Sequence, residues 1–195
     1  MMYLLMNPLK VEALFIVMII ISPSITFAAK HIPKGEKQKS HQNELFEAVN
    51  EFCDTTHLIN LETCQKTLRS DPRSASAKDQ GTLTTISIDL ALAETTKTRD
   101  YLVSILPKIP SNDVELQSAL KDCISAYQSG VGSLAMLPQS YQEDRLSASY
   151  DMSMAYQTFQ GCENSLNSHK IVDPSILDAH RNAYVFVNLT MELQE

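Results

Sequence analysis

The stretch TLTTISIDLALAETTKTRDYLVSI, residues 82–105, decides the fold class of this chain. Its apolar side chains fall on one side of a helical wheel, and Asp89 and Arg99 lie away from them. The apolar side consists of Leu83, Ile86, Leu90, Ala93, Tyr101 and Ile105. This pattern predicts a long amphipathic α-helix. Pro107 and Pro110 should end it, because proline lacks a backbone donor and keeps the preceding residue out of helical geometry.

A second helix is predicted directly after these prolines. Asn112 can cap its start, and Glu115 follows three residues later, as in a capping box. Its apolar positions are Leu116, Leu120, Cys123, Tyr127 and Leu134. We expect Pro138 to close this helix.

Two more amphipathic segments complete the chain. The third predicted helix covers about residues 142–166, and its apolar stripe is Leu146, Tyr150, Met154 and Cys162. The fourth opens at Ser175, after Asp173 and Pro174. One arc of it carries Ile176, Ala179, His180, Ala183, Tyr184, Val187, Thr190 and Met191, and the other carries Asp178, Arg181, Asn182 and Glu192. Four such helices with short connections predict an all-α, up-and-down four-helix bundle, and residues 44–71 predict a short helical hairpin in front of it.

The composition is that of one ordinary globular domain. The 195 residues are 44% hydrophobic, which is too apolar for a disordered chain. Only 5 residues are glycine, as expected of a nearly all-helical protein. With 16 basic and 23 acidic residues the formal net charge is -7, and this balance argues against a nucleic-acid partner, because phosphates are bound by clustered lysine and arginine.

The amino terminus has the layout of a secretory signal peptide. An unbroken apolar run at residues 14–21 follows a basic residue, and small residues mark a cleavage point between Ala28 and Ala29. The alternative is a membrane anchor, but a span needs roughly 20 apolar residues. We therefore expect residues 1–28 to be removed, residues 29–43 to form a flexible polar leader, and the mature protein to be secreted with no membrane attachment.

The cysteines predict two disulfides. Cys53, Cys64, Cys123 and Cys162 are an even number in a chain marked for an oxidising compartment. The sequence alone leaves three pairings open. The predicted positions of the helices favour a disulfide between Cys53 and Cys64 across the leading hairpin, and one between Cys123 and Cys162 across adjacent bundle helices. No pair has the Cys-x-x-Cys spacing of zinc ligands, so no metal site is expected.

The sequence contains no motif for catalysis. It lacks a Gly-x-Ser-x-Gly elbow, a His-Glu-x-x-His helix and a glycine-rich phosphate loop, so we expect neither an enzyme nor a cofactor. We interpret His180 as a buried, hydrogen-bonded core histidine. Ile88, Leu92 and Val103 stand opposite the core stripe of their helix and are candidates for a docking face. Asn188 starts the only N-glycosylation sequon, at the edge of a polar arc where a glycan is sterically allowed.

Six short segments carry a resemblance to a known family. They are CDTT at residues 53–56, CQKTL at 64–68, SDPRS at 70–74, ALKDC at 119–123 with Tyr127 after it, LSAS at 146–149, and GCE at 161–163. Together they resemble the plant invertase and pectin methylesterase inhibitor family, from about residue 44 to residue 193. The resemblance implies a four-helix bundle with an amino-terminal helical hairpin and the same two disulfides.

The resemblance also implies a non-catalytic function. Members bind pectin methylesterase or acid invertase one to one and cover its active-site cleft, in the apoplast or alternatively in the vacuole. Invertase inhibitors insert a Pro-Lys-Phe element from the loop between the second and third bundle helices, and residues 138–145 lack that triplet here, so both targets stay open. The target-contact residues expected in this loop are Pro138, Gln139, Tyr141, Glu143 and Arg145. The alternative to inhibition is a helical module that holds a small apolar ligand or has a structural role in the wall.

Overall fold

All regular structure in the described part of the chain is helical. The computed structural model describes residues 46–194 and contains, in order, α2 (Glu47–Cys53), α3 (Leu61–Leu68), η2 (Pro72–Ser76), α4 (Gln80–Ile105), η3 (Leu106–Lys108), α5 (Val114–Glu143), α6 (Arg145–Ser168) and α7 (Pro174–Gln194). The predicted all-α class and the bundle with a preceding hairpin are confirmed. The signal peptide and leader expected at residues 1–43 lie outside the described residues. Within residues 46–194, none of the helices combines the length and the apolar character that crossing a bilayer requires.

Acidic and amide side chains fix where the helices begin. The side chains of Asn60, Asp79 and Asp113 each accept a hydrogen bond from a backbone N–H in the first turn of α3, α4 and α5. Asp113 therefore caps α5, one residue after the predicted Asn112. Asp173 accepts from the first turn of α7, which begins at Pro174. These caps satisfy donors that a helix leaves free at its amino end.

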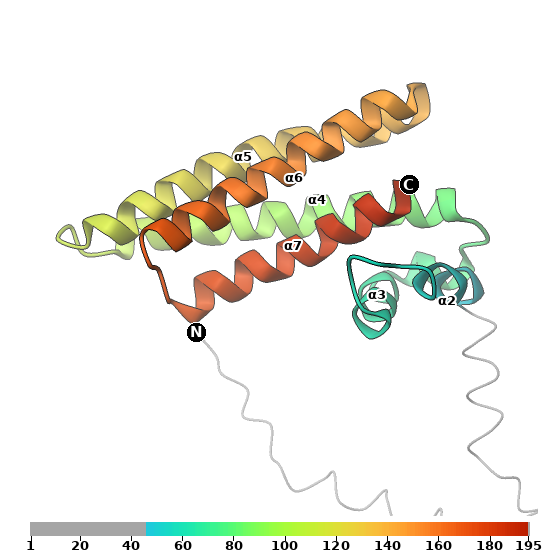
Figure 1. Ribbon diagram of the computed structural model, residues 1–195, viewed down its shortest axis with the longest axis horizontal. Helices are drawn as coiled ribbons and strands as arrows, with labels where there is room; N and C mark the ends of the chain where they lie inside the picture. The colour runs from blue at the N-terminus through green and yellow to red at the C-terminus, as the bar shows by residue number, and fades with distance from the viewer. Residues whose placement is uncertain (1–45, 195) are drawn as a thin grey trace, which may run out of the picture. The chain divides into compact units, whose positions relative to one another are not determined.

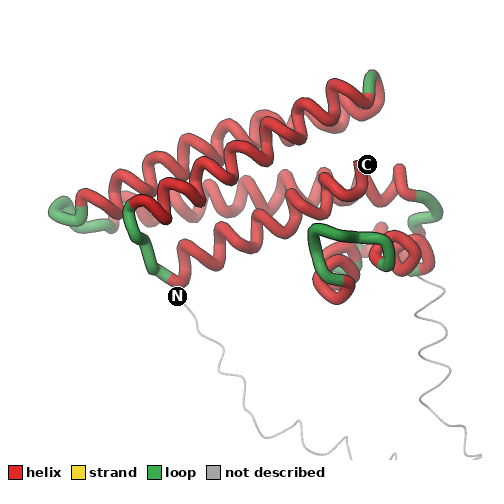
Figure 2. Tube along the Cα trace, in the orientation of Figure 1, coloured by secondary structure: helices red, strands yellow, loops and turns green. Residues whose placement is uncertain are grey.

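The four long helices form an antiparallel bundle (Figures 1 and 2). The most extensive contact is between α5 and α6, α4 packs against both α5 and α7, and α6 touches α7 least among these neighbours. In Figure 1, α6 runs alongside α5 and α7 runs alongside α4. The hairpin of α2 and α3 lies against α4.

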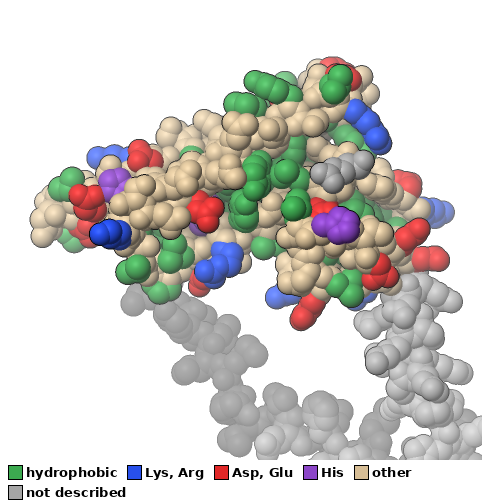
Figure 3. Space-filling view, in the orientation of Figure 1, with side chains coloured by type: hydrophobic (Ala, Val, Ile, Leu, Met, Phe, Trp, Pro, Cys, Tyr) green, Lys and Arg blue, Asp and Glu red, His purple; other side chains and the backbone are tan. Residues whose placement is uncertain are grey.

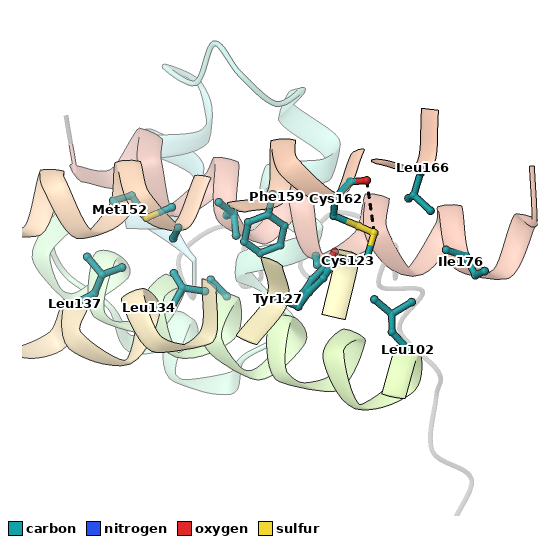
Figure 4. Close-up of a cluster of buried hydrophobic side chains, with 14 of the residues drawn as sticks. Leu102, Cys123, Tyr127, Leu134, Leu137, Met152, Phe159, Cys162, Leu166 and Ile176 are labelled. Atoms are coloured by element: carbon teal, nitrogen blue, oxygen red, sulfur yellow. Dashed lines mark hydrogen bonds between the residues drawn. A yellow bond between two sulfur atoms is a disulfide. The ribbon is translucent and has the colours of Figure 1, made fainter. Parts of the chain in front are cut away.

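The bundle core is a single apolar cluster from all four helices (Figure 4). Tyr127 of α5 and Phe159 of α6 meet edge to face, with ring centroids 5.1 Å apart. Leu102 of α4 and Ile176 of α7 are also fully buried. Burial of this cluster supplies the main favourable term for folding.

Two disulfides brace the fold. The disulfide between Cys123 and Cys162 joins α5 to α6. The disulfide between Cys53, at the end of α2, and Cys64 joins α2 to α3. These are the pairs that the predicted positions of the helices favour. In the loop-entropy treatment the first bridge stabilises the fold by about 4 kcal/mol and the second by about 3 kcal/mol. The α5–α6 pair and the α2–α3 hairpin are each held covalently.

Hydroxyl groups join α4 to α7. Thr84 donates to the Leu193 carbonyl at 2.9 Å, and Thr190 donates to the Ser87 carbonyl at 3.1 Å. The predicted stripe on α4 was therefore incomplete, because threonine and serine also face the core. The expected docking face on this helix is wrong in part, since Ile88 is buried in the core.

The same correction extends to the other two members of that face. Leu92 is half-buried and packs against the core, and Val103 alone is exposed. No continuous apolar face stands opposite the core on α4. A single exposed valine is common on a protein surface and carries no docking site.

The last turns of α7 anchor the hairpin. Leu189 and Leu193 share an apolar cluster with Val49 and Leu68 of the hairpin helices. Glu192 was predicted on the exposed arc, but it is buried. Its Oε1 accepts hydrogen bonds from two backbone N–H groups of the α2–α3 connection, those of His57, at 2.7 Å, and Leu58.

A polar network crosses the core between α5 and α7. Tyr127 Oη and His180 Nδ1 are 3.0 Å apart, so His180 is the buried, hydrogen-bonded histidine that its position predicts. Burial lowers the pKa of His180 below its ordinary value of 6.5.

A second polar pair joins α6 to α7. Tyr184 of α7 meets Tyr156 of α6, with the two hydroxyl oxygens 2.8 Å apart, and burial raises the pKa of Tyr184 to about 12.

The sequon on α7 is not on the surface. Asn188 is buried rather than at the edge of an exposed arc, and Thr190 is fully buried. A glycan on Asn188 has no room in this fold. The expectation that a glycan is sterically allowed there is wrong.

Candidate target-binding surface

The segment expected to be a target-contact loop is almost entirely helical. Helix α5 continues through Pro138 to Glu143, and α6 begins at Arg145, so only Asp144 separates the two helices. Proline removes one backbone donor near the end of a long helix, and the remaining hydrogen bonds and core contacts of α5 hold the last turns together. The predicted closure of the second helix at Pro138 is therefore wrong. The loop at residues 138–145 is instead the tip of a helical hairpin.

Asp144 makes this sharp connection. Its backbone is extended, and its carboxylate accepts hydrogen bonds from the N–H of Ser147 at 3.1 Å and of Leu146 at 3.3 Å. The pKa of Asp144 lies below its usual value, mainly because the Ser147 backbone N–H donates a hydrogen bond to the charged carboxylate. Asp144 therefore ends α5 and caps α6 in a single residue.

The predicted contact residues lie on the helix ends at this tip. Pro138, Gln139, Glu143 and Arg145 are exposed. Gln139 Nε2 donates to Glu143 Oε1 at 2.7 Å, which links two successive turns of α5. The tip therefore presents an ordered polar edge rather than a flexible loop.

Tyr141 differs from the other four. It is half-buried and packs against the bundle core. With Pro138 and Gln142 it lines a groove of about 350 Å³, whose other wall is the first turns of α4. That wall consists of Asp79, Gly81, Thr82, Thr85 and Ile88. Tyr141 thus contributes to a groove beside the tip rather than to its exposed edge.

An exposed apolar stripe on α6 was missed in the sequence. Leu146, Tyr150 and Met154 were predicted to face the core, but their exposed fractions are 80%, 65% and 36%. The core stripe of α6 is instead Ala148, Met152, Ala155, Phe159, Cys162 and Leu166. Both stripes have helical spacing, and the larger side chains near the start of the helix are on the exposed one. The small side chains of Ala148 and Ala155 suit the core position because α5 packs closely there.

Met136 of α5 is a fourth exposed apolar side chain in this part of the hairpin. Ser140 of α5 donates a hydrogen bond to Asp151 of α6, which sets the antiparallel register of the two helices. Met136 lies one turn before Ser140, and Met154 lies one turn after Asp151, so the two methionines are at the same level of the hairpin. Both are exposed.

We call Met136, Leu146, Tyr150 and Met154 the outer face of the α5–α6 hairpin. Figure 3 shows hydrophobic side chains gathered over this end of the hairpin. Large apolar side chains grouped in this way on a surface are typical of protein–protein contact sites. The register of the hairpin is fixed at one end by Ser140 and Asp151 and further along by the Cys123–Cys162 disulfide.

This surface has the chemistry of binding. Within residues 46–194, no group of three His, Cys, Asp or Glu residues could hold a metal ion. His180 is buried against Tyr127, away from the tip. The outer face and the tip offer apolar area, hydrogen-bonding side chains and a fixed backbone, which suit docking onto another protein.

The comparisons with known proteins identify the family. The family described as "Plant invertase/pectin methylesterase inhibitor" matches residues 47–192. The chain is 29% identical over 68% of its length to a "putative invertase inhibitor" of Platanus orientalis, covering 75% of that protein. It is 31% identical over 60% of its length to a protein of the same name from Platanus acerifolia, covering 64% of it. A "Cell wall / vacuolar inhibitor of fructosidase 2" of Arabidopsis thaliana is 27% identical to this chain. The match covers 62% of this chain and 62% of that protein.

Solved structures support the fold. A mutant form of a pectin methylesterase inhibitor from Arabidopsis superimposes with a TM-score of 0.61, at 21% identity, over 73% of this chain and 91% of that one. Another solved structure, of a pectin methylesterase inhibitor from Arabidopsis thaliana, gives a TM-score of 0.55, at 20% identity, over 75% of this chain and 93% of that one. These identities are low enough that the likeness speaks for the fold alone. The match over residues 47–192 covers most of the chain, which therefore belongs to the plant invertase/pectin methylesterase inhibitor family, a family of enzyme inhibitors and not of enzymes.

Proposed function

We propose that this protein is secreted and inhibits one enzyme, either a pectin methylesterase or an acid invertase, by covering its active-site cleft in a one-to-one complex. The observation that carries the proposal is the family match over residues 47–192. A signal peptide at residues 1–28, cleaved between Ala28 and Ala29, would direct the protein to the apoplast, with the vacuole as the alternative. Two disulfides in the described domain are consistent with an oxidising compartment.

The tip and outer face of the α5–α6 hairpin are the proposed contact surface. The tip presents Pro138, Gln139, Glu143 and Arg145, and the outer face adds exposed apolar area next to it. Tyr141 would take part through the groove that it lines with the start of α4. Because a disulfide and a capped one-residue turn hold this hairpin, little conformational freedom is lost when it docks.

Stoichiometric inhibition tests the proposal. Disulfide-bonded protein from a secreting host is titrated at acidic pH against purified pectin methylesterase and, separately, against acid invertase. We expect residual activity of one enzyme to fall linearly and to reach its minimum near one equivalent. Size-exclusion chromatography with light scattering should show a complex of one copy of each chain. Full activity of both enzymes at tenfold excess of the protein would reject inhibition.

A matched pair of variants tests the contact surface. Tyr150→Asp places a charge on the outer face, and Val103→Asp places the same charge at an exposed apolar position of α4. We expect Tyr150→Asp to weaken inhibition at least about tenfold, since central aromatic contacts dominate protein interfaces, and Val103→Asp to leave it unchanged. Circular dichroism should show both variants folded. Equal inhibition by the two variants would place the contact elsewhere on the bundle.

A further inference from the structure

The described domain contains two kinds of methionine. Met136 and Met154 are exposed, with 52% and 36% of their surface accessible. Met152 lies on the core side of α6 with 2% of its surface accessible, and Met191 is half-buried against the core. A reagent in solution therefore reaches the sulfur atoms of the first pair before that of Met152.

The exposed pair lies on the proposed contact surface. The Ser140–Asp151 hydrogen bond places Met136 and Met154 at the same level of the hairpin, one on each helix. Tyr150 is one turn from Met154 along α6. Both thioethers would thus be covered when the outer face docks.

We propose that Met136 and Met154 are a redox-sensitive modification site, at which hydrogen peroxide converts the thioethers to sulfoxides and thereby releases the target enzyme. The inference rests on the proposed inhibitory function. Burying an apolar thioether in an interface is favourable, whereas burying a sulfoxide requires a partner for its polar oxygen. A surface suited to an apolar side chain provides no such partner.

The chemical step needs one molecule of peroxide per methionine. A lone pair of the sulfur attacks one peroxide oxygen, the O–O bond breaks, and a sulfur–oxygen bond forms. The departing hydroxide takes the proton from the transferred oxygen and leaves as water. The sulfur is oxidised by two electrons and the peroxide is reduced. Methionine sulfoxide reductases reverse the change with two electrons from a dithiol, which becomes a disulfide as the sulfoxide oxygen leaves as water.

Limited oxidation tests the inference. The disulfide-bonded protein is treated with hydrogen peroxide until mass spectrometry of its peptides shows sulfoxide at residues 136 and 154 but not at 152. We expect its inhibition of the target enzyme to weaken at least about fivefold, and methionine sulfoxide reductases to restore it. The circular dichroism spectrum should stay unchanged, because both side chains are on the surface.

Two variants locate the effect. Met136→Leu combined with Met154→Leu removes both thioethers and keeps an apolar side chain at each position, so the inhibition that this double variant shows before peroxide treatment should be the same after it. Met152→Leu is the matched control and should remain sensitive to peroxide. Unchanged inhibition by the oxidised parent protein, or loss of inhibition by the oxidised double variant, would overturn the inference. Absence of inhibition before oxidation would instead reject the proposed function, so the two failures are distinguishable.

Discussion

At the scale of single residues, two glycines of α5 show how closely the helices approach. A Cβ atom at Gly130 would be 2.8 Å from Thr158 Oγ1 of α6 and 3.5 Å from the Phe159 ring, whereas a Cβ atom at Gly132 would meet nothing within 4 Å. Thr158 cannot move away easily, since its hydroxyl donates to the Ala155 carbonyl at 2.6 Å. The missing side chain at Gly130 therefore lets α5 and α6 pack.

This contrast gives a matched pair of mutations. Gly132→Ala should raise the free energy of unfolding by about 0.5–1 kcal/mol, because alanine favours a helix over glycine. Gly130→Ala has the same propensity gain but must displace Thr158, and we expect it to lower the free energy of unfolding by about 1–3 kcal/mol. Urea denaturation measures both. Equal stabilisation by the two substitutions would mean that α5 and α6 lie further apart than described.

At the scale of elements, the α5–α6 hairpin depends on its disulfide. Cys123 and Cys162 are 39 positions apart and close the loop that contains the tip. Replacing both cysteines with serine should lower the free energy of unfolding by about 4 kcal/mol in the loop-entropy treatment. The same replacement at Cys53 and Cys64, 11 positions apart, should lower it by about 3 kcal/mol.

Chemical denaturation under non-reducing conditions compares these two double variants with the parent protein. We also expect the loss of the Cys123–Cys162 bridge to increase amide hydrogen exchange in α5 and α6, and the loss of the other bridge to increase it in α2 and α3. Exchange that rises only in the hairpin of α2 and α3 for both variants would contradict the bracing role of the longer bridge.

The elements also show what the sequence could and could not predict. The number of long helices and their order follow from apolar spacing, which depends on each segment alone. Pro138 predicts the end of α5 too early, because the hydrogen bonds and core contacts of the surrounding helix tolerate a proline there. On α6 the prediction is right for Cys162, which is buried, and wrong for Leu146, Tyr150 and Met154, because two sets of positions have helical spacing and only the packing partner decides which set is buried. The outer face was missed for that reason.

At the scale of the whole molecule, buried His180 makes stability depend on pH. Burial is the main effect that lowers its pKa below 6.5 in the folded state, while the charge of Glu163 raises it and that of Arg181 lowers it. The unfolded state therefore binds more protons as the solution is acidified. The contribution of neutral His180 to stability is complete above pH 6.5 and is lost as the pH falls from there towards the lowered pKa.

His180→Gln removes this titration and keeps a side chain able to bond Tyr127. We expect the free energy of unfolding of the parent protein to fall more steeply than that of this variant below pH 6.5, by up to about 1.4 kcal/mol per pH unit. His57→Gln, at an exposed histidine, serves as the control. Thermal unfolding between pH 4 and pH 8 provides the comparison. Parallel pH profiles for the parent protein and His180→Gln would show that His180 does not govern this dependence.

The hydrogen bonds that Glu192 accepts affect how the protein folds while it is being synthesised. The Glu192 carboxylate bonds backbone groups of the α2–α3 connection, 135 positions earlier in the chain for His57. The hairpin is made before the bundle helices, and it packs against both α4 and the last turns of α7. During synthesis α4 can cover part of the hairpin's apolar side, but the part that Leu189 and Leu193 cover stays exposed until α7 emerges. We infer that the nascent chain is most exposed to chaperones and to aggregation in this interval.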